Sequence, residues 1–251
     1  MARMNPVLLI TGGGRGIGAA VARLAAAQGW DVALNAVRDM ASAQAVAAEV
    51  QALGRRALAV QADVSDEAAV RALFARVDAE LGPLRGLVNN AGVVDIAQRV
   101  DQMSLGRWQR MFAINVQGTF LCTREALRRM STQHGGTGGS IVNLSSAAAR
   151  LGSAGQYVDY AAAKAAIDTF TLGVAREVAH EGVRVNAVRP GIIDTDIHAS
   201  GGQPDRVQRM APQVPMQRAG TAEEVAQAVV WLLSDQASYT TGSVLDVAGG
   251  R

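Results

Sequence analysis

Short apolar runs alternate with alanine-rich segments along almost the whole chain. The apolar runs are continuous in Val, Leu and Ile, which is typical of strands buried on both faces of a parallel sheet. The seven predicted strands are Val7–Thr11, Val32–Asn35, Ala57–Gln61, Leu84–Asn89, Ile141–Leu144, Val183–Val188 and Val244–Val247. The segments between them have helical periodicity. The six predicted helices span residues 16–28, 40–53, 66–81, 104–130, 157–180 and 221–233.

The order of these elements predicts an α/β fold with a doubly wound parallel sheet and helices on both faces, the Rossmann-type architecture. No linker or change of composition divides the chain, so we expect residues 1–251 to form a single domain. Ser65 and Thr221 are expected to begin two of the helices. The connection that starts at Gly191 is long for such a fold and follows the carboxyl end of a strand, which indicates a substrate lid over residues 191–212.

Composition excludes several other classes of protein. The 24 Lys and Arg residues nearly balance the 22 Asp and Glu, and aromatic residues make up only 4%, whereas a nucleic-acid site needs a basic stripe with interleaved aromatics. No apolar run approaches the ~20 residues that cross a bilayer. The first ten residues, MARMNPVLLI, lack the length and cleavage pattern of a signal peptide. With one cysteine, Cys122, and three dispersed histidines, we expect a cytoplasmic protein without a disulfide, metal site, nucleic-acid partner or membrane partner.

A glycine-rich turn, Gly12-Gly13-Gly14-Arg15-Gly16-Ile17-Gly18, joins the first predicted strand to the first helix. Glycines let the backbone turn tightly and approach a pyrophosphate, whose charge meets the free amides of the helix N-terminus. The strict G-x-G-x-x-G spacing is absent, and a turn of this kind also occurs where a strand and a helix merely pack closely. Its place in the first strand–turn–helix unit favours a dinucleotide site.

The end of the second strand bears on which dinucleotide binds. Residues Leu34 to Arg38, including Asn35, offer no carboxylate that could accept a hydrogen bond from a ribose 2′-hydroxyl. Arg15 and Arg38 could instead hold a 2′-phosphate, because guanidinium geometry suits phosphate oxygens. Asp39 follows immediately and could still turn toward the ribose. We therefore expect NADP(H), with NAD(H) as the alternative.

Two further strand ends carry candidate cofactor contacts. Asp63 and Val64 follow the third strand, where the carboxylate could hold an adenine amine or form part of a helix cap. The fourth strand ends in Asn89-Asn90-Ala91-Gly92. The small residues of this segment would let the backbone lie against a cofactor, and an asparagine side chain would tie the strand end to its neighbours.

The chain contains one lysine, Lys164, which lies four residues after Tyr160. Four residues are one helical turn, so the phenol and the ammonium share a helix face. A phenol with a pKa near ~10 is a poor acid–base catalyst at neutral pH, and a neighbouring cation pulls that pKa down. The pair is a candidate acid–base site, and a solvated surface pair is the alternative.

These motifs resemble the short-chain dehydrogenase/reductase family in order and spacing over nearly the whole chain. Asn115, Ser145-Ser146 and Pro190-Gly191 extend the match. The segments from Ser145 to Lys164 and from Tyr239 to Gly250 are most similar to bacterial glucose 1-dehydrogenase-like and 3-oxoacyl-acyl-carrier-protein-reductase-like oxidoreductases. The joint match is specific, although each motif alone is weak.

The resemblance implies an oxidoreductase that interconverts a carbonyl and a secondary alcohol by hydride transfer. Tyr160 would act as acid and base, Lys164 would lower its pKa and hold the nicotinamide ribose, and Asn115 would support a proton relay. A serine would stabilise the oxyanion. Ser146 is the expected serine, although it lies one residue farther from Tyr160 than is usual in the family, and Ser145 is its alternative. The family also implies a homotetramer packed through the two long helices and the last strand.

The resemblance adds the segment after the sixth strand to the cofactor contacts, where backbone and hydroxyl groups would hold the nicotinamide. The full set of expected cofactor contacts is Gly12, Gly14, Arg15, Gly16, Ile17, Gly18, Asn35, Arg38, Asp63, Val64, Asn89, Ala91, Gly92, Tyr160, Lys164, Pro190, Gly191, Ile193 and Thr195. The expected partner is a small-molecule carbonyl compound or alcohol.

Two other functions stay open at this point. A non-catalytic nucleotide-binding sensor or scaffold would keep the fold, but it would be expected to lack Tyr160, Lys164 or the serine. Epimerisation would need a second acid–base group near the substrate, for which the sequence offers His198 or Asp194. Sugars, acyl thioesters and alicyclic ketones are all possible substrates.

Overall fold

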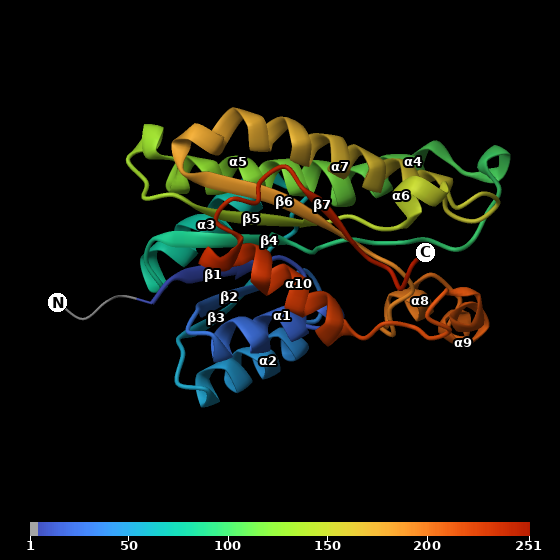
Figure 1. Cartoon of the computed structure of the whole chain (residues 1–251), viewed down its shortest axis with the longest axis horizontal. Helices are drawn as coiled ribbons and strands as arrows, with labels where there is room; N and C mark the ends of the chain where they lie inside the picture. The colour runs from blue at the N-terminus through green and yellow to red at the C-terminus, as the bar shows by residue number, and fades with distance from the viewer. Residues whose placement is uncertain (1–4) are drawn as a thin grey trace.

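Seven parallel strands form one sheet in the computed structural model, which describes residues 5–251 (Figure 1). The strands are β1 (Val7–Ile10), β2 (Asp31–Ala36), β3 (Ala57–Gln61), β4 (Leu84–Asn89), β5 (Gly139–Leu144), β6 (Val183–Pro190) and β7 (Val244–Val247). Their order across the sheet is β3-β2-β1-β4-β5-β6-β7. The predicted doubly wound fold is confirmed. Because the order reverses between β1 and β4, a crevice opens at the carboxyl ends of these two strands.

Helices cover both faces of the sheet because successive strand residues point to opposite sides and are apolar on both. Leu8 and Ile10 of β1 belong to the core under α1, α2 and α10, whereas Val7 and Leu9 belong to the core under α3, α5 and α7. In Figure 1, α1, α2 and α10 lie below the sheet, and α5 and α7 lie above it. These helices are α1 (Gly16–Ala27), α2 (Met40–Ala52), α3 (Glu67–Glu80), α5 (Gly118–Met130), α7 (Val158–Val178) and α10 (Ala222–Leu233).

The single helix predicted over residues 104–130 is interrupted. A π-helical segment, Ala113–Gln117, joins α4 (Leu105–Phe112) to α5. The side-chain amide of Asn115 donates to the carbonyl oxygen of Met111 at 3.0 Å, and an unbroken α-helix would pair that oxygen with the backbone N–H of Asn115. Insertions of this kind often lie at functional sites, and this one lies beside the candidate site described below.

One of the two predicted helix starts is wrong. Asp66, rather than Ser65, begins α3, because its carboxylate accepts a hydrogen bond from the backbone N–H of Ala68 at 2.7 Å. The Ser65 hydroxyl donates to Asp63 instead, at 2.7 Å. Thr221 begins α10 as predicted, with reciprocal hydrogen bonds that complete a capping box.

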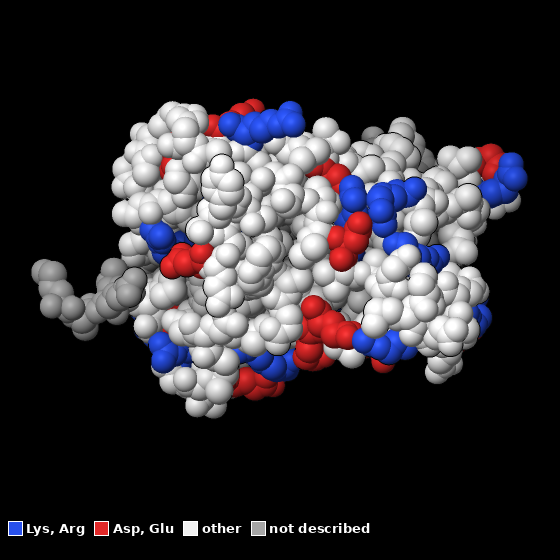
Figure 2. All heavy atoms as spheres, viewed as in Figure 1, with Lys and Arg blue, Asp and Glu red and all other residues white. Residues whose placement is uncertain are grey.

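The segment predicted as a lid, residues 191–212, contains two short helices, α8 (Ile197–Ser200) and α9 (Arg206–Met210), which lie beside the C-terminus in Figure 1. Within residues 5–251, no helix has both the length and the apolar character that a bilayer crossing requires. Basic and acidic side chains are interspersed on the face shown in Figure 2. The first ten residues, which lack the pattern of a signal peptide, include residues 1–4, and these four lie outside the described residues.

Candidate active site

A cavity of about 920 Å³ lies over the carboxyl ends of the strands, where the strand order reverses. Ligands of doubly wound sheets bind at this position. The cavity brings together most of the residues predicted to form the site. These are Gly12, Gly14, Arg15, Gly16, Ile17, Arg38, Asp63, Val64, Ala91, Gly92, Ser146, Tyr160, Lys164, Pro190, Gly191, Ile193 and Thr195.

Four predicted residues, Gly18, Asn35, Asn89 and Asn115, lie outside the cavity lining. Asn35 is buried, and its amide donates to the backbone beyond β3 at 2.8 Å. The Asn89 amide donates to Asn143 of β5 at 2.9 Å. Gly18 permits close packing, since an added Cβ would lie 2.5 Å from the carbonyl oxygen of the first glycine of the turn. These three residues therefore hold the walls of the cavity together.

The glycine turn leaves the N-terminus of α1 open to a ligand. Arg15 precedes the helix without a side-chain capping bond, and the first turn contains no acidic residue. Gly12 and Gly16 have φ of +63° and +51°, which side chains rarely allow. A Cβ on Gly14 would lie 3.0 Å from the backbone nitrogen of Ala43. Free amides at a helix N-terminus favour a phosphate, so these features fit the diphosphate of a dinucleotide.

Asn90 performs the tying role that the motif predicted for an asparagine. Its Nδ2 donates to the carbonyl oxygens of Thr11 and Gly12 at 2.9 and 2.8 Å. The Thr11 hydroxyl accepts hydrogen bonds from the backbone N–H groups of Asn90 and Ala91, both at 3.0 Å. These bonds fix the end of β4 against the glycine turn. The signal in the sequence was the strand end itself, because Asn90 is the first residue beyond β4.

Two exposed arginines, Arg15 and Arg38, lie at the β2 end of the cavity. Asp39 accepts hydrogen bonds from the hydroxyl and the backbone N–H of Ser42, at 2.5 and 3.0 Å, and thereby caps α2. The hydrogen bonds from Ser42, supported by the charge of Arg15, lower the pKa of Asp39. The carboxylate of Asp39 is thus engaged in a helix cap.

Tyr160, Ser146 and Lys164 meet in the wall of the cavity. The Lys164 Nζ lies 5.6 Å from the centroid of the Tyr160 ring and donates to the carbonyl oxygen of Leu144 at 2.6 Å. The side chain of the half-buried Ser146 acts on the Tyr160 phenol and lowers its pKa. Ser145 is buried, and its hydroxyl donates to the backbone oxygen of Lys164 at 3.1 Å. Both serines line the cavity, and Ser146 is the one whose side chain acts on Tyr160.

Burial is the largest cause of the shifted pKa values of Tyr160 and Lys164. It raises the pKa of Tyr160 to about 12, although the hydrogen bond with Ser146 acts in the opposite direction. It lowers the pKa of Lys164 to about 8, against the charge of Asp168. The expected lowering of the Tyr160 pKa by Lys164 therefore does not describe the protein without a ligand, because burial is the largest cause and the opposing effect comes from Ser146. At neutral pH, Tyr160 is a phenol and can donate a proton.

We expect the wild-type protein to gain stability relative to the Lys164→Met variant as the pH rises from about 8 to about 10. The pKa of Lys164 is about 8 in the folded protein and ~10.4 in an unfolded chain. The unfolded chain therefore binds more protons in this interval, and unfolding becomes less favourable as the pH rises. Below about pH 8, burial of the protonated Lys164 lowers the stability of the folded protein by about 3 kcal/mol. Urea unfolding of both proteins across this range measures the difference, and a constant difference would contradict the shifted pKa.

Asn115 positions the segment that follows β4. Its Oδ1 accepts a hydrogen bond from the backbone N–H of Val93 at 3.2 Å, and its Nδ2 donates to the Val93 carbonyl oxygen at 3.1 Å. Gly92 lies between Asn115 and Lys164, since an added Cβ would lie 2.8 Å from the Asn115 Oδ1 and 3.5 Å from the Lys164 Nζ. The Asn115 side chain thus holds the cavity wall next to Lys164 without facing the cavity itself.

Tyr157 fastens the lid to the start of α7. Its buried hydroxyl accepts a hydrogen bond from the Gln203 Nε2 at 2.5 Å and donates to the carbonyl oxygen of Gly201 at 3.5 Å. A Cβ on Gly201 would lie 2.9 Å from the side chain of Val94. Within the lid, the Nε2 of His198 lies 2.9 Å from the carbonyl oxygen of Ile193. The lid therefore lies against both α7 and the segment after β4.

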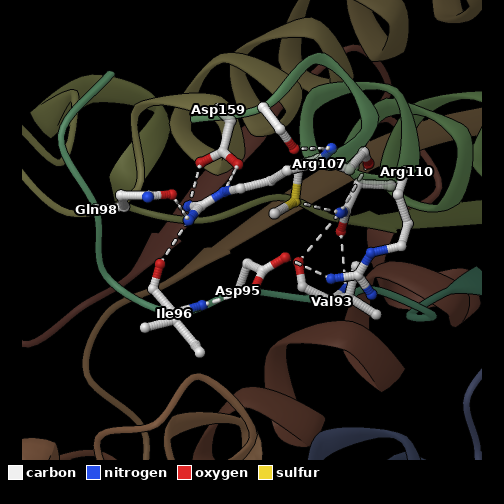
Figure 3. A network of polar contacts seen from close by, with 10 residues as sticks. Val93, Asp95, Ile96, Gln98, Arg107, Arg110 and Asp159 are labelled. Atoms are coloured by element: carbon white, nitrogen blue, oxygen red, sulfur yellow. Dashed lines mark hydrogen bonds and ion pairs between the residues drawn. The ribbon is translucent and has the colours of Figure 1, made fainter. Parts of the chain in front are cut away.

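An ion pair joins α4 to α7, and a hydrogen bond from the same arginine holds the segment after β4 (Figure 3). The Arg107 guanidinium makes two hydrogen bonds with Asp159, at 2.8 and 3.1 Å, and donates to the carbonyl oxygen of Ile96 at 2.6 Å. The side chains of Arg107 and Asp159 are only 8% and 0% exposed. Because Asp159 precedes Tyr160 in α7, this pair fixes α4 and the segment after β4 relative to the candidate acid.

The sheet, the glycine turn and the group around Tyr160 together define an oxidoreductase on a Rossmann-type scaffold. Comparisons with known proteins narrow this class. Residues 12–251 match the sequence profile of the family described as "Enoyl-(Acyl carrier protein) reductase". The chain is 54% identical over 245 residues to the uncharacterized oxidoreductase YgfF of Escherichia coli (strain K12), with 98% of this chain and 99% of that protein covered.

A second relative is the cis-4-hydroxycyclohexanecarboxylate dehydrogenase of Sinomonas cyclohexanicum, which is 41% identical, with coverage of 97% of this chain and 95% of that protein. A short-chain dehydrogenase from Burkholderia cenocepacia, solved in complex with NADP, superposes with a TM-score of 0.90 at 35% identity, with 98% of each chain covered. The chain therefore belongs to the short-chain dehydrogenase/reductase family, and the resemblance drawn from the sequence is confirmed.

Proposed function

We propose that this protein is an NADP(H)-dependent oxidoreductase that interconverts a ketone or aldehyde and its alcohol. One observation carries the proposal: Tyr160, with Ser146 and Lys164 beside it, faces the same cavity as the open N-terminus of α1. That cavity, of about 920 Å³, is at the upper end of the ~300–1,000 Å³ typical of ligand and cofactor sites. The arrangement supports proton transfer at a position that a bound nicotinamide can reach.

Each residue of this group has a distinct role in the proposed reduction. When bound, the nicotinamide supplies the hydride that the carbonyl carbon accepts. Tyr160 donates its phenolic proton to the carbonyl oxygen, and Ser146 donates a hydrogen bond to the same oxygen as negative charge develops on it. Lys164 presents a cation to the phenolate that remains and to ribose hydroxyls. Asn115 keeps the wall beside Lys164 in place, and a proton relay through this region stays part of the proposal.

The preference for NADP(H) over NAD(H) rests on Arg15 and Arg38. We predict that Arg38→Ala raises the Kd of NADPH about 10-fold, the effect of losing a charged hydrogen bond, and changes the Kd of NADH less than about 2-fold. Thermal-shift titrations with both cofactors measure this difference, since a ligand at 100 times its Kd adds about 2.7 kcal/mol to the folded state.

Arg71→Ala is the matched control for this cofactor test. Arg71 is an exposed arginine of α3 that pairs with Glu67 and lies outside the cavity lining. Equal losses for NADPH and NADH in Arg38→Ala would refute the 2′-phosphate argument and leave the reaction class untouched.

Turnover itself is tested with purified protein, NADPH and a panel of ketones and aldehydes, by the loss of NADPH absorbance. The relative named for cis-4-hydroxycyclohexanecarboxylate supplies the first compound, the corresponding ketone 4-oxocyclohexanecarboxylate. Tight NADPH binding without turnover across the panel would favour the non-catalytic sensor or scaffold over the enzyme.

A single domain, a cytoplasmic location and a homotetramer stay predictions. Exposed apolar side chains on α4, α5 and α7, namely those of Trp108, Phe120 and Leu172, support packing of another subunit against this side of the sheet.

A further inference from the structure

The guanidinium of Arg206 lies in the cavity near Tyr157 and has no acidic partner among residues 5–251. Arg206 of α9 lines the cavity, and its Nη1 donates to the Oε1 of Gln156 at 2.6 Å and to the Oε1 of Gln203 at 3.3 Å. Its guanidinium carbon lies 5.2 Å from the centroid of the Tyr157 ring. Among the carboxylates of residues 5–251, none forms an ion pair with Arg206. Its Nη1 thus binds neutral side chains, which leaves its charge uncompensated.

The neighbouring charges reinforce this imbalance. Arg251 also lines the cavity, and its charge, together with that of Arg209, adds to burial in lowering the pKa of Arg206. Asp205 pairs with Arg209, and Asp159 pairs with Arg107. Asp196 also lines the cavity, but no carboxylate is among the charges that act on the pKa of Arg206. This end of the cavity therefore carries excess positive charge.

A half-buried cation without a counter-ion destabilises the protein that holds it. A ligand that supplies an anion there regains this energy, and a carboxylate matches the planar fork of a guanidinium. Two Arg206 nitrogens, Nε and Nη2, make no hydrogen bond within residues 5–251. They can donate to such a ligand while Nη1 keeps its bond to Gln156.

The position of Arg206 assigns this anion to the substrate. Arg206 contacts Tyr157 and Gln156, and Tyr157 lies one helical turn before Tyr160. The groups expected to hold cofactor phosphates, which are the glycine turn and Arg38, belong to β1, β2 and the start of α1. Arg206 has no hydrogen bond to either of them.

We infer that Arg206 binds a carboxylate of the substrate, so that the protein reduces oxo acids and oxidises the corresponding hydroxy acids. This inference rests on the proposed function and narrows its substrate class. The carboxylate would pair with Arg206 while the oxo group, farther along the substrate, meets Tyr160 and Ser146. Hydride addition to the carbonyl carbon and proton donation from Tyr160 would then leave the carboxylate unchanged.

The test compares matched charged and uncharged substrates. Wild-type protein, Arg206→Gln, Arg206→Lys and Arg209→Gln are assayed with NADPH on several oxo acids, including 4-oxocyclohexanecarboxylate, and on the methyl ester of each. We expect the wild type to prefer the acids, and Arg206→Gln to lower kcat/KM for the acids about 10- to 100-fold, the effect of losing a charged hydrogen bond. The loss should appear mainly in KM, because the contact lies away from the reacting atoms.

Three further readouts separate binding from a structural role of Arg206. The kcat/KM for the esters should stay within about 3-fold in Arg206→Gln, and Arg206→Lys should recover part of the preference for acids. Arg209→Gln, which removes an exposed arginine of the same helix, should behave like the wild type. Equal losses for acids and esters would show that Arg206 only holds the lid, and would overturn the inference.

Failure of the inference and failure of the proposed function look different. A wild-type protein that reduces the esters as well as the acids overturns the substrate class and keeps the oxidoreductase. If NADPH binds but no acid or ester is reduced, the proposed function falls, and the inference falls with it.

Discussion

Tyr160→Phe is expected to lower kcat for carbonyl reduction about 10³-fold, within the range seen when a general acid is removed. Tyr160 is a phenol at neutral pH, because burial raises its pKa to about 12. Phenylalanine keeps the ring that packs near the Lys164 Nζ but has no proton to give. Steady-state rates with NADPH and the best substrate of the panel measure the loss, and a thermal-shift titration should show that NADPH still binds.

Tyr239→Phe is the matched control, because it removes the hydroxyl of a fully exposed tyrosine, 103% exposed. Its rates should equal those of the wild type. If Tyr160→Phe keeps more than about a tenth of the activity, another group must donate the proton. His198 would be the first candidate, since it also lines the cavity.

The fold followed from the sequence because its strands are apolar on both faces. Residues such as Leu8 and Leu9 face opposite cores, so continuous hydrophobic runs marked the buried strands. The edge strand β7, which includes Asp246 and is partly exposed, was also predicted. The π-helical segment at Ala113–Gln117 could not be predicted, because it depends on a contact between Asn115 and Val93, 22 residues apart in the sequence. Periodicity reports only neighbours along the chain.

The candidate site was predictable where local motifs form it and less so where distant segments meet. The glycine turn and the turn of helix that carries Tyr160 and Lys164 line the cavity as expected. Asn35 and Asn89 lie within strands, and their side chains bond to the backbone just beyond β3 and to β5. The alternation of residues along a strand did not show whether these side chains face the cavity or a neighbouring strand. Arg206 had no signal beyond its place in the lid, because its role depends on which residues lack a partner in three dimensions.

The raised pKa of Tyr160 is a second property that the sequence could not supply. Spacing placed a cation one turn away, which predicts a lower pKa, but it gave no measure of how far the folded chain buries the phenol. Burial is the largest cause of the pKa of Tyr160. The consequence for the proposed reaction is that, in the protein without a ligand, Tyr160 is prepared to donate a proton rather than to accept one.

Breaking the pair between Arg107 and Asp159 should have the largest effect on stability. We predict that Asp159→Asn lowers the free energy of unfolding by about 3–5 kcal/mol, because it leaves a buried guanidinium without its counter-ion. The side chains of Arg107 and Asp159 are 8% and 0% exposed, so water cannot replace the lost partner. Urea unfolding of the variant and the wild type at one pH measures the difference.

A double variant distinguishes the loss of a partner from the loss of the pair. Arg107→Met with Asp159→Leu removes both charges, and we expect it to recover most of the stability that Asp159→Asn loses, because apolar residues of similar volume often replace a buried pair at little cost.

Arg99→Gln is the control for an exposed pair, with side chains 73% and 60% exposed, and should cost less than about 1 kcal/mol. A loss as small for Asp159→Asn would mean that water or a neighbouring group already compensates Arg107. If the double variant is stable but reduces substrates slowly, the pair serves the reaction by holding residues 93–98 against the helix of Tyr160.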